Sequence, residues 1–378
     1  MRIESIKVEN FRNIHSAEVL LPSRLNVFLG DNGAGKTSLL EAAHIVLTGR
    51  SQRRATNEVM LRKGADYFRV AANLTLGKAS VVSEYGYSPG RQRSIKINNN
   101  PVRGLSELLN EFAVVSFAPE DLQLVTGTPA GRRRAIDFLL STASAGYLTR
   151  LTDYSRAIQQ KNKLLKDLQK SGPHGSDRDQ LHSFNAQIIE LGVELMRARS
   201  AYSREIASSL HDIYAELSDE AETVSAEYTP SVVEEDESKW AEAFERQIEE
   251  NEEKERILAV AVVGPHRDDW ELTLANRPAR QHASQGQARS LAVAMKLAGF
   301  RYLESMRGDT PVLLFDEIFG ELDPGRGKRL LKIVGKFAQA LITSVQPATI
   351  EQLGEDASCF NIVEGAIESV PESDTRGH

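Results

Sequence analysis

The stretch Leu25-Asn-Val-Phe-Leu-Gly-Asp-Asn-Gly-Ala-Gly-Lys-Thr37 decides the fold of this chain. Its first part, Leu25–Leu29, is a short apolar run that ends at a glycine, as is typical of a buried parallel strand. The segment Ser38–Leu47 follows, and its apolar residues fall on one helical face: Leu39, Leu40, Ala43, Val46 and Leu47. The pattern therefore predicts a strand, a glycine-rich loop and a helix, in that order.

The loop Gly30–Thr37 matches the phosphate-binding pattern Gly-x-x-x-x-Gly-Lys-Thr. Its glycines let successive backbone N–H groups surround phosphates, while Lys36 neutralises the outer phosphates and Thr37 ligates Mg²⁺. We therefore expect ATP and Mg²⁺ as cofactors. The residues predicted to bind the nucleotide here are Gly30, Asp31, Asn32, Gly33, Ala34, Gly35, Lys36, Thr37 and Ser38.

A phosphate-binding loop needs a carboxylate that holds Mg²⁺ at the end of a neighbouring buried strand. The run Val312–Phe315 is followed directly by Asp316 and Glu317. Without the loop, these would be read as two exposed charges after a core strand. With it, we expect Asp316 to hold the metal together with Thr37, and Glu317 to orient or deprotonate the attacking water. The predicted catalytic residues are Glu317, Lys36 and Asp316.

The segment Ser284-Gln-Gly-Gln287 opens an apolar helical pattern shortly before the Asp316 strand. It is similar to the signature of ABC ATPases, in which a serine hydroxyl and glycine N–H groups at a helix N-terminus bind a γ-phosphate. The resemblance implies that Ser284, Gly286 and Gln287 complete the site of a second chain, and that Asp323 belongs to a D-loop. Taken alone, Ser-x-Gly-Gln is more often an ordinary helix cap.

Other periodic segments outline the rest of the fold. Alternating residues between Phe68 and Ile97 predict an antiparallel meander, with turns at Gly77-Lys78 and Ser88–Gly90. Two helical patterns, separated by the breaker Ser171–Ser176, predict an arm of antiparallel helices at Tyr147–Leu168 and about Leu181–Leu217. Further strands are predicted at Ala113–Phe117, Ile257–Val263, Pro311–Phe315 and Ala340–Thr343, and the acidic stretch Glu234–Glu255 is read as a solvated helix or linker.

The predicted fold class is α/β. It is an ABC-type P-loop ATPase head assembled from N- and C-terminal segments, with an antiparallel β subdomain and an inserted short helical arm. We expect residues 1–140 to form the N-terminal part of the head, 141–256 the arm, 257–370 the C-terminal part of the head, and 371–378 a disordered tail.

Composition excludes several classes of protein. With 378 residues, 41% hydrophobic and 26% charged, the chain can bury a full core. Its first residues are interrupted by charges, and it has no run of eighteen apolar residues, so we expect neither a signal peptide nor a membrane span. A single cysteine, Cys359, favours a reducing cytoplasm.

The net charge of −7 argues against a nucleic-acid binder, but it hides an asymmetry. Residues 1–134 hold 19 Lys and Arg against 12 Asp and Glu, so a polyanion is expected to meet the N-terminal part. Each basic cluster there has the alternative of a solvated face or of intramolecular ion pairs. The candidate DNA-contacting residues are Arg50, Arg53, Arg54, Arg62, Lys63, Arg91, Arg93, Arg132, Arg133 and Arg134.

From end to end, the chain resembles the RecF family of bacterial recombinational-repair proteins. SMC-type ATPases share the inserted arm, but theirs is far longer. Gly264-Pro-His-Arg-Asp-Asp269 is the most family-specific segment, although spacing alone makes His266 and Asp268 an exposed turn. The segments that carry the resemblance are Val8–Asn13, Gly33–Ala42, Phe117–Leu122, Gly127–Arg134 with Asp137, Gly264–Asp269, Ser284–Gln287, Phe315–Glu317 and Leu322-Asp323.

The resemblance implies an ATP-dependent, head-to-tail homodimer that holds double-stranded DNA near gaps or junctions and has no membrane partner. It implies work with RecR and RecO to help load RecA, and a weak, DNA-stimulated ATPase whose slow hydrolysis releases DNA. Asp316-Glu317 replaces the Asp-Asp that is frequent in the family, and Ser344-Val-Gln346 replaces the switch histidine of transporters, which favours a slow switch. The alternatives are an SMC-like or transporter-type ABC ATPase subunit, and an ATP-binding structural clamp with negligible turnover.

Overall fold

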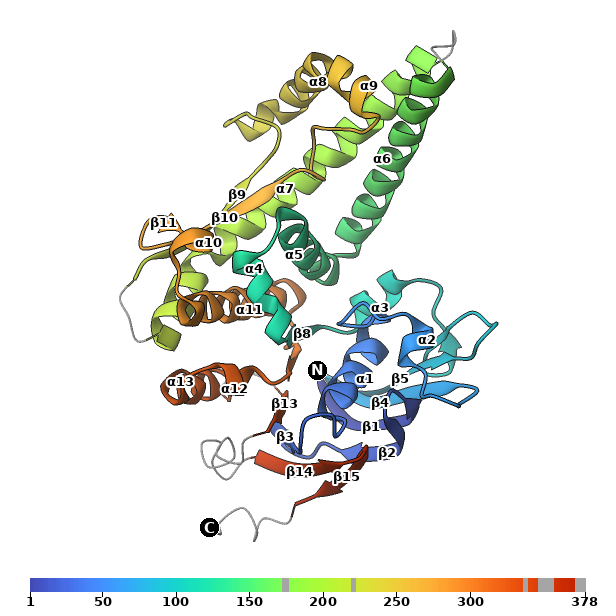
Figure 1. Cartoon of the computed structure of the whole chain (residues 1–378), viewed down its shortest axis with the longest axis vertical. Helices are drawn as coiled ribbons and strands as arrows, with labels where there is room; N and C mark the ends of the chain where they lie inside the picture. The colour runs from blue at the N-terminus through green and yellow to red at the C-terminus, as the bar shows by residue number, and fades with distance from the viewer. Residues whose placement is uncertain (172–176, 219–221, 336–338, 346–356, 371–378) are drawn as a thin grey trace. The chain divides into compact units, whose positions relative to one another are not determined.

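The computed structural model describes residues 1–171, 177–218, 222–335, 339–345 and 357–370. The breaker after Ser171, the tail from Pro371 and Gln346 therefore lie outside the described residues. The chain forms two compact units, whose elements are labelled in Figure 1. Unit 1 comprises Met1–Asp121, Ala215–Glu220 and Val293–His378, and unit 2 comprises Leu122–Tyr214 and Ala221–Ala292.

Unit 1 contains a six-stranded, mainly parallel sheet with the order β15-β14-β3-β13-β12-β8. Strand β3 pairs in parallel with β13 on one side and with β14 on the other, so the sheet joins strands from both ends of the chain. The strands predicted near residues 113, 311 and 340 are confirmed, as is a core that is discontinuous in sequence. The strands are β3 (Leu25–Leu29), β8 (Val114–Phe117), β12 (Val312–Phe315), β13 (Ala340–Ser344), β14 (Ala357–Val363) and β15 (Ala366–Ser369).

A second, antiparallel sheet in unit 1 has the order β2-β1-β4-β5-β6-β7. Side chains of β4 and β5 alternate between buried and more exposed positions, which confirms the predicted meander. Its two first strands, β1 and β2, were not part of that prediction. The strands are β1 (Arg2–Phe11), β2 (Ile14–Leu20), β4 (Phe68–Leu76), β5 (Ala79–Tyr87), β6 (Ser94–Ile97) and β7 (Asn100–Pro101).

Helix α1 (Lys36–Thr48) packs against strands of both sheets. Burial therefore extends beyond the predicted apolar face and includes polar residues such as Glu41 and His44. Because the helix is enclosed on two sides, its N-terminus and the loop before it are held in place by the core. The other helices of unit 1 are α2 (Asn57–Met60), α3 (Leu105–Glu111), α12 (Ile318–Glu321) and α13 (Pro324–Val334), with a 3₁₀ turn, η1, at Pro119–Leu122.

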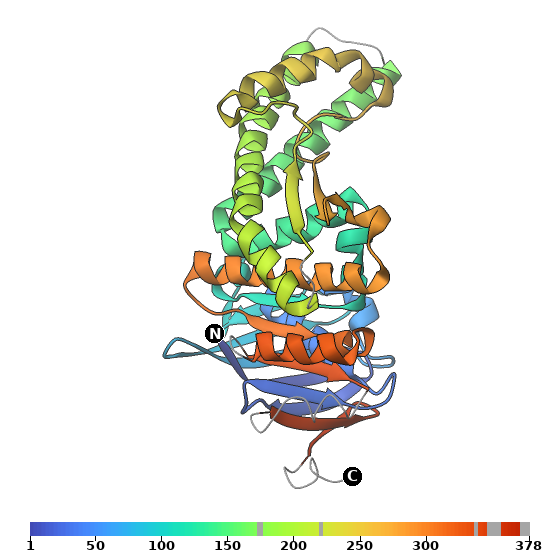
Figure 2. The same cartoon turned by 90° about the vertical axis from the view of Figure 1, so that its left-hand side faces the viewer.

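In unit 2, two long helices run side by side in opposite directions (Figure 1 and Figure 2). They confirm the predicted pair of arm helices. A short antiparallel sheet, β11-β10-β9, accompanies them. The elements are α4 (Gln123–Thr126), α5 (Pro129–Ala143), α6 (Ala145–Ser171), α7 (Asp177–Ser218), β9 (Val224–Thr229), η2 (Glu237–Lys239), α8 (Trp240–Glu250), α9 (Glu252–Leu258), β10 (Asp269–Leu274), β11 (Arg277–Pro278), α10 (Ala279–His282) and α11 (Gln285–Arg307), of which α7 and α11 continue into unit 1.

The strand predicted at Ile257–Val263 is wrong. This run is the end of α9 followed by a loop, because Ala259 adopts the left-handed conformation that ends a helix. The loop N–H groups of Ala261 and Val262 then donate to the side chains of Asn162 and Glu255 instead of to a strand. The acidic stretch before it is helical and largely exposed, as predicted, except that Glu255 is buried against Lys161 at 2.6 Å.

No helix in the described ranges combines the length and the apolar character needed to cross a membrane.

Candidate nucleotide-binding site

The glycine-rich loop joins β3 to α1 within unit 1, as the sequence predicts. Gly30 has a φ of 154°, and a Cβ at this position would lie 2.3 Å from the carbonyl oxygen of Ile362. Gly35, with a φ of 122°, precedes the first helical residue. Both positions therefore require glycine, one because a backbone approaches closely and the other because of its conformation. Asp31 and Asn32, at the tip of the loop, are exposed, whereas Ala34 is buried.

Lys36 is buried and its ammonium turns back into the loop. Its Nζ donates to the carbonyl oxygens of Gly30 at 2.7 Å and Asp31 at 2.9 Å. It also forms an ion pair with Glu317 Oε1 at 3.0 Å. The loop thus carries a preplaced positive charge, as a phosphate site requires.

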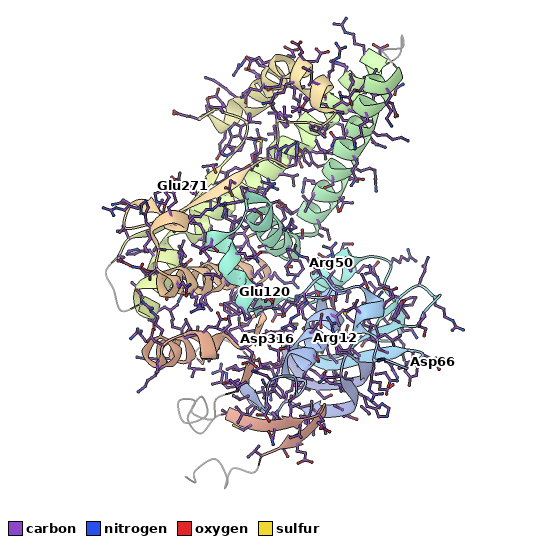
Figure 3. All side chains as sticks on the ribbon, in the orientation of Figure 1. Arg12, Arg50, Asp66, Glu120, Glu271 and Asp316 are labelled. Carbon is purple, nitrogen blue, oxygen red and sulfur yellow. The ribbon has the colours of Figure 1, made fainter. Side chains whose placement is uncertain are left out.

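Asp316, labelled in Figure 3, directly follows the last residue of β12, and its side chain contacts Thr37 at the start of α1. Its Oδ1 accepts hydrogen bonds from the hydroxyls of Thr37 at 2.8 Å and Thr343 at 3.0 Å. Burial raises the pKa of the Asp316 carboxyl, against the opposing effect of these hydrogen bonds. Thr37 and Asp316 together offer a hydroxyl and a carboxylate, which are hard oxygen donors that suit Mg²⁺.

Glu317 has an unusual backbone for a non-glycine residue, with a φ of 56° in the left-handed region. The Glu317 N–H donates to the hydroxyl of Thr343 at 2.9 Å, which holds this turn. The conformation directs the carboxylate, which is 27% exposed, towards Lys36. A strained residue at the end of a buried strand is a feature of functional sites.

Asn13, in the turn between β1 and β2, braces the loop and was not among the predicted site residues. Its Nδ2 donates to the Gly33 carbonyl at 2.9 Å, and its Oδ1 accepts from the Ser38 hydroxyl at 2.8 Å. Next to it, Arg12 forms an ion pair with the buried Glu41 of α1 at 2.8 Å. The sequence signal for both residues was their place in the Val8–Asn13 segment that carries the family resemblance.

Arg53 lies at the carboxylate that is predicted to hold the metal, with its Nη2 3.4 Å from Asp316 Oδ2. The contact of Arg53 with DNA stays a prediction, and the structure places its guanidinium at the candidate nucleotide site. Asp323 caps α13 by accepting from the Arg326 N–H at 3.0 Å, and its side chain is 52% exposed. Ser344 is a buried residue of β13.

The segment Ser284–Gln287 belongs to unit 2 and forms a reciprocal cap on α11. The Gln287 N–H donates to the Ser284 hydroxyl at 3.2 Å, and the Ser284 N–H donates to Gln287 Oε1 at 2.8 Å. These two hydrogen bonds form a capping box, so the segment does cap the helix, as the helix-cap interpretation predicts. Ser284 is nevertheless exposed, so a role towards a second chain stays a prediction.

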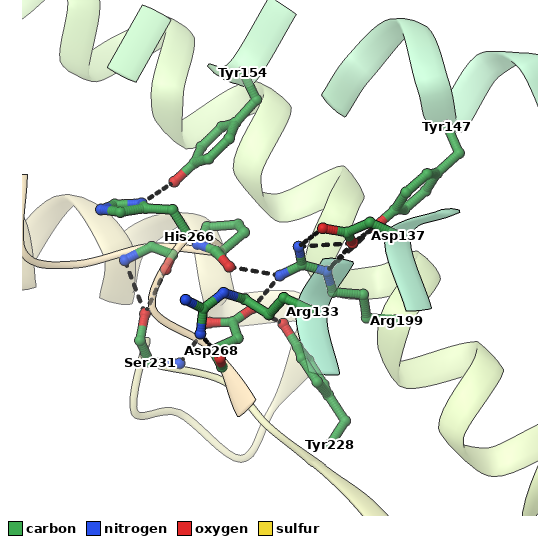
Figure 4. Close-up of polar contacts among 11 residues, drawn as sticks. Arg133, Asp137, Tyr147, Tyr154, Arg199, Tyr228, Ser231, His266 and Asp268 are labelled. Carbon is green, nitrogen blue, oxygen red and sulfur yellow. Dashed lines mark hydrogen bonds and ion pairs between the residues drawn. The ribbon is translucent and has the colours of Figure 1, made fainter. Parts of the chain in front are cut away.

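The loop Gly264–Asp269 is tied into a buried polar network in unit 2 (Figure 4). At its centre, the Arg199 guanidinium donates to both oxygens of Asp137, at 2.9 and 3.0 Å, and to Asp268 Oδ2 at 2.9 Å. Asp268 is 1% exposed and also accepts from the Ser231 N–H and the Tyr228 hydroxyl. Because every charge is paired, this network can be buried without a large penalty.

The prediction that His266 and Asp268 form an exposed turn is wrong. His266 donates from Nε2 to the Ala261 carbonyl at 3.0 Å, and its Nδ1 accepts from the Tyr154 hydroxyl at 2.7 Å. Burial lowers the pKa of His266 to about 4, so the imidazole is neutral near pH 7. The family-specific segment therefore holds unit 2 together rather than facing solvent.

Arg132 was predicted to contact DNA, but the structure buries its side chain. It is 6% exposed and donates to both carboxylate oxygens of Asp269 at 2.7 Å, so its charge is used inside unit 2. Arg133 is half-buried and donates to the Asp268 carbonyl, whereas Arg134 is exposed. The remaining candidates are all at least partly exposed: Arg50, Arg54, Arg62, Lys63, Arg91 and Arg93.

Comparisons with known proteins agree with this geometry. Residues 2–367 match the model of the family described as "RecF/RecN/SMC N terminal domain". The chain is 34% identical to the DNA replication and repair protein RecF of Heliobacterium modesticaldum, over 97% of this chain and 99% of that one. It is 31% identical to RecF of Staphylococcus carnosus, over 97% of this chain and 100% of that one.

Solved structures are similar over nearly the whole length. A structure of the recombination mediator protein RecF with ATP, in the RecFOR pathway, has a TM-score of 0.89 at 28% identity and covers 98% of each chain. An Smc head bound to the C-terminal winged-helix domain of ScpA has a TM-score of 0.57 at 17% identity, which shows the fold alone. The fold is that of an ABC-type ATPase head with an inserted helical arm.

Proposed function

Since this chain belongs to the RecF family of DNA replication and repair proteins, within the SMC and ABC ATPase superfamily, we propose that it is an ATP-driven DNA clamp. In this proposal ATP closes two chains head to tail on double-stranded DNA near gaps or junctions. Slow, DNA-stimulated hydrolysis then opens the clamp and releases the DNA. The predicted division of the chain into head, arm and tail stays a prediction alongside it.

The observation that carries the proposal is the convergence of four side chains at one end of β3 and β12. Lys36, Thr37, Asp316 and Glu317 come from segments 279 residues apart and are joined by direct contacts. Lys36 is suited to bind the outer phosphates, and Glu317 to orient or deprotonate water. Thr37 and Asp316 would hold Mg²⁺, which when bound would neutralise phosphate charge.

The surface proposed to meet DNA lies at one end of the antiparallel sheet. Phe68, which begins β4, pairs with Tyr87, which ends β5, so the loops beside them are neighbours. The hydroxyls of Tyr85 and Tyr87 donate to Asn57 and Glu58 of α2 at 2.8 and 2.6 Å. The connections beside these elements carry the candidate basic residues: Arg50, Arg54, Arg62, Lys63, Arg91 and Arg93.

Two of these cations stand close together at the end of α1. Arg93 Nη1 donates to the Gly49 carbonyl at 3.3 Å, which places its guanidinium beside Arg50. Partial burial, together with the charge of Arg93, lowers the pKa of Arg50. Two like charges without a carboxylate partner among the described residues favour an anionic ligand, and phosphate contacts of this kind make DNA binding salt-dependent.

The partners follow from the family. RecF structures similar to this chain are described within the RecFOR pathway, and on that basis we propose that it works with RecR and RecO in loading RecA. Each of these contacts is open to direct binding measurements with the purified proteins.

Sedimentation velocity tests the clamp as a whole. The chain should be monomeric without nucleotide, dimeric with ATP and Mg²⁺, and more completely dimeric when gapped duplex DNA is added. Arg50→Glu and Arg93→Glu should weaken DNA binding at least about tenfold and flatten its salt dependence, whereas Lys78→Glu, in the turn at the other end of β4, should not. A chain that stays monomeric with ATP and DNA contradicts the proposal.

A further inference from the structure

The side-chain amide of Gln287 is held from both ends. Its Oε1 accepts from the Ser284 N–H at 2.8 Å, within the cap of α11. Its Nε2 donates to both carboxylate oxygens of Glu222, at 3.0 and 3.1 Å. A reversed amide would place its oxygen against the carboxylate, so these contacts allow one orientation only.

Glu222 is itself fixed in place. The hydroxyl of Tyr214, a fully buried residue of α7, donates to Glu222 Oε2 at 3.1 Å. The donors to this carboxylate, the hydroxyl of Tyr214 and the side-chain amide of Gln287, are both neutral. Hydrogen bonds to an ionised acceptor are about twice as strong as neutral ones, so the carboxylate is a firm anchor for the Gln287 amide.

We propose that Glu222 is a positioning residue for the composite nucleotide site. Glu222 orients Gln287, and Gln287 in turn fixes the backbone of Ser284 at the N-terminus of α11. That terminus supplies the hydroxyl and N–H groups that receive the γ-phosphate of the second chain, so the inference rests on the proposed function. Glu222 does not touch nucleotide in this arrangement. Small displacements matter here, because a phosphate site needs its donors within a fraction of an ångström.

The test compares three variants of the full chain. Glu222→Ala removes the anchor, Glu222→Gln keeps an acceptor for Gln287 and Tyr214 without the charge, and Glu227→Ala changes an exposed glutamate of neighbouring β9. ATP affinity of the monomer is measured by fluorescent nucleotide binding, and ATP-dependent dimerisation by sedimentation. Backbone hydrogen exchange of the first turn of α11 is followed by mass spectrometry.

We expect Glu222→Ala to need about tenfold more protein for half-dimerisation with ATP, while monomer affinity for ATP and thermal unfolding stay unchanged. The first turn of α11 should exchange faster in this variant. Glu222→Gln should restore most of both properties, and Glu227→Ala should resemble the wild type. A merely structural role would lower thermal stability and ATP affinity together.

The inference is overturned if Glu222→Ala dimerises normally, or if exchange at the first turn of α11 is unaltered. A wild-type chain that fails to dimerise with ATP contradicts the proposed function instead. In that case, unaltered exchange in Glu222→Ala still overturns the positioning role, and faster exchange still supports the contact from Glu222 to the cap.

Discussion

The ammonium of Lys36 lies 3.0 Å from the carboxylate of Glu317, so the residue predicted to bind phosphate and the residue predicted to activate water neutralise each other. Phosphates that bind Lys36 must compete with this carboxylate. We therefore expect binding of the nucleotide to free Glu317 for its predicted role in activating water. Such a pair would keep the predicted catalytic carboxylate occupied until a substrate is present.

Replacing Lys36 by Met should abolish ATP-dependent dimerisation. The β- and γ-phosphates lose their main protein charge, and Glu317 loses its partner. Sedimentation at saturating ATP checks this, with circular dichroism to show that the variant is folded. Conversion of the variant from monomer to dimer would contradict the assignment of Lys36.

Glu317→Gln should leave ATP binding intact and slow phosphate release by about a hundredfold or more, because it removes the water-activating group. Dimers should accumulate, since ATP is not consumed. The phosphate-release rate also separates a working ATPase from a structural clamp with negligible turnover. Normal turnover in this variant would assign the catalytic base to another residue.

Ser284→Arg should separate ATP binding by the monomer from ATP-dependent dimerisation, two properties that would change together if the site lay within one chain. ATP affinity of the monomer should stay within about twofold, because the loop Gly30–Thr37 is unchanged, whereas dimerisation should fail. A mixture of Ser284→Arg and Lys36→Met chains forms one composite site with neither lesion, so it should recover some hydrolysis. Normal dimerisation of Ser284→Arg alone would reduce the segment to a helix cap.

Breaking the network of Figure 4 should destabilise the protein strongly. Arg199→Met leaves Asp137 and Asp268 buried without their cation, at a cost of about 3–5 kcal/mol. Arg204→Met, on the same helix, removes an ion pair with Glu237 in which Arg204 is 64% exposed and should cost less than about 1 kcal/mol. Urea unfolding compares the two, and equal losses would contradict the structural role of the network.

Acid should weaken the same region through His266, whose pKa is lowered from 6.5 to about 4 by burial. As pH falls, the unfolded chain takes up this proton first, so the stabilising effect is complete above about pH 6.5 and is lost as pH falls towards 4. The expected loss is up to about 3 kcal/mol for this group. His266→Gln should show a shallower fall in the unfolding free energy between pH 7 and 4, and an identical slope would argue against the assignment.

The nucleotide loop was predictable because its residues are contiguous and each has a local requirement, such as glycine at Gly30 and Gly35. The arm helices were also predictable, because their apolar residues keep the helical period over a long stretch of the sequence. The polar network was not, because Arg199 is separated from Asp137 by 62 residues and from Asp268 by 69. The spacing of residues around His266 does not indicate which distant residues contact this segment.

The predicted strand at Ile257–Val263 failed for a different reason. Ile257 and Leu258 are exposed at the end of α9, and apolar periodicity cannot distinguish the end of a helix from a strand when the run is short. Strands β1 and β2 were not predicted, because a bulge between Ile3 and Ser5 interrupts the alternation in β1 and because His15 and Ser16 are consecutive exposed residues in β2. Glu222 carried no sequence signal, since its partner Gln287 lies 65 residues away.

The pairing of β3 between β13 and β14 has a consequence for synthesis on the ribosome. The strand that leads into the nucleotide loop emerges first, but both of its neighbours are made more than 300 residues later. The growing chain must therefore keep this apolar strand from aggregating until translation is nearly finished. A chain that stops before Ala340 lacks both neighbours of β3, so the sheet around the nucleotide loop can be completed only when nearly all of the chain has been made.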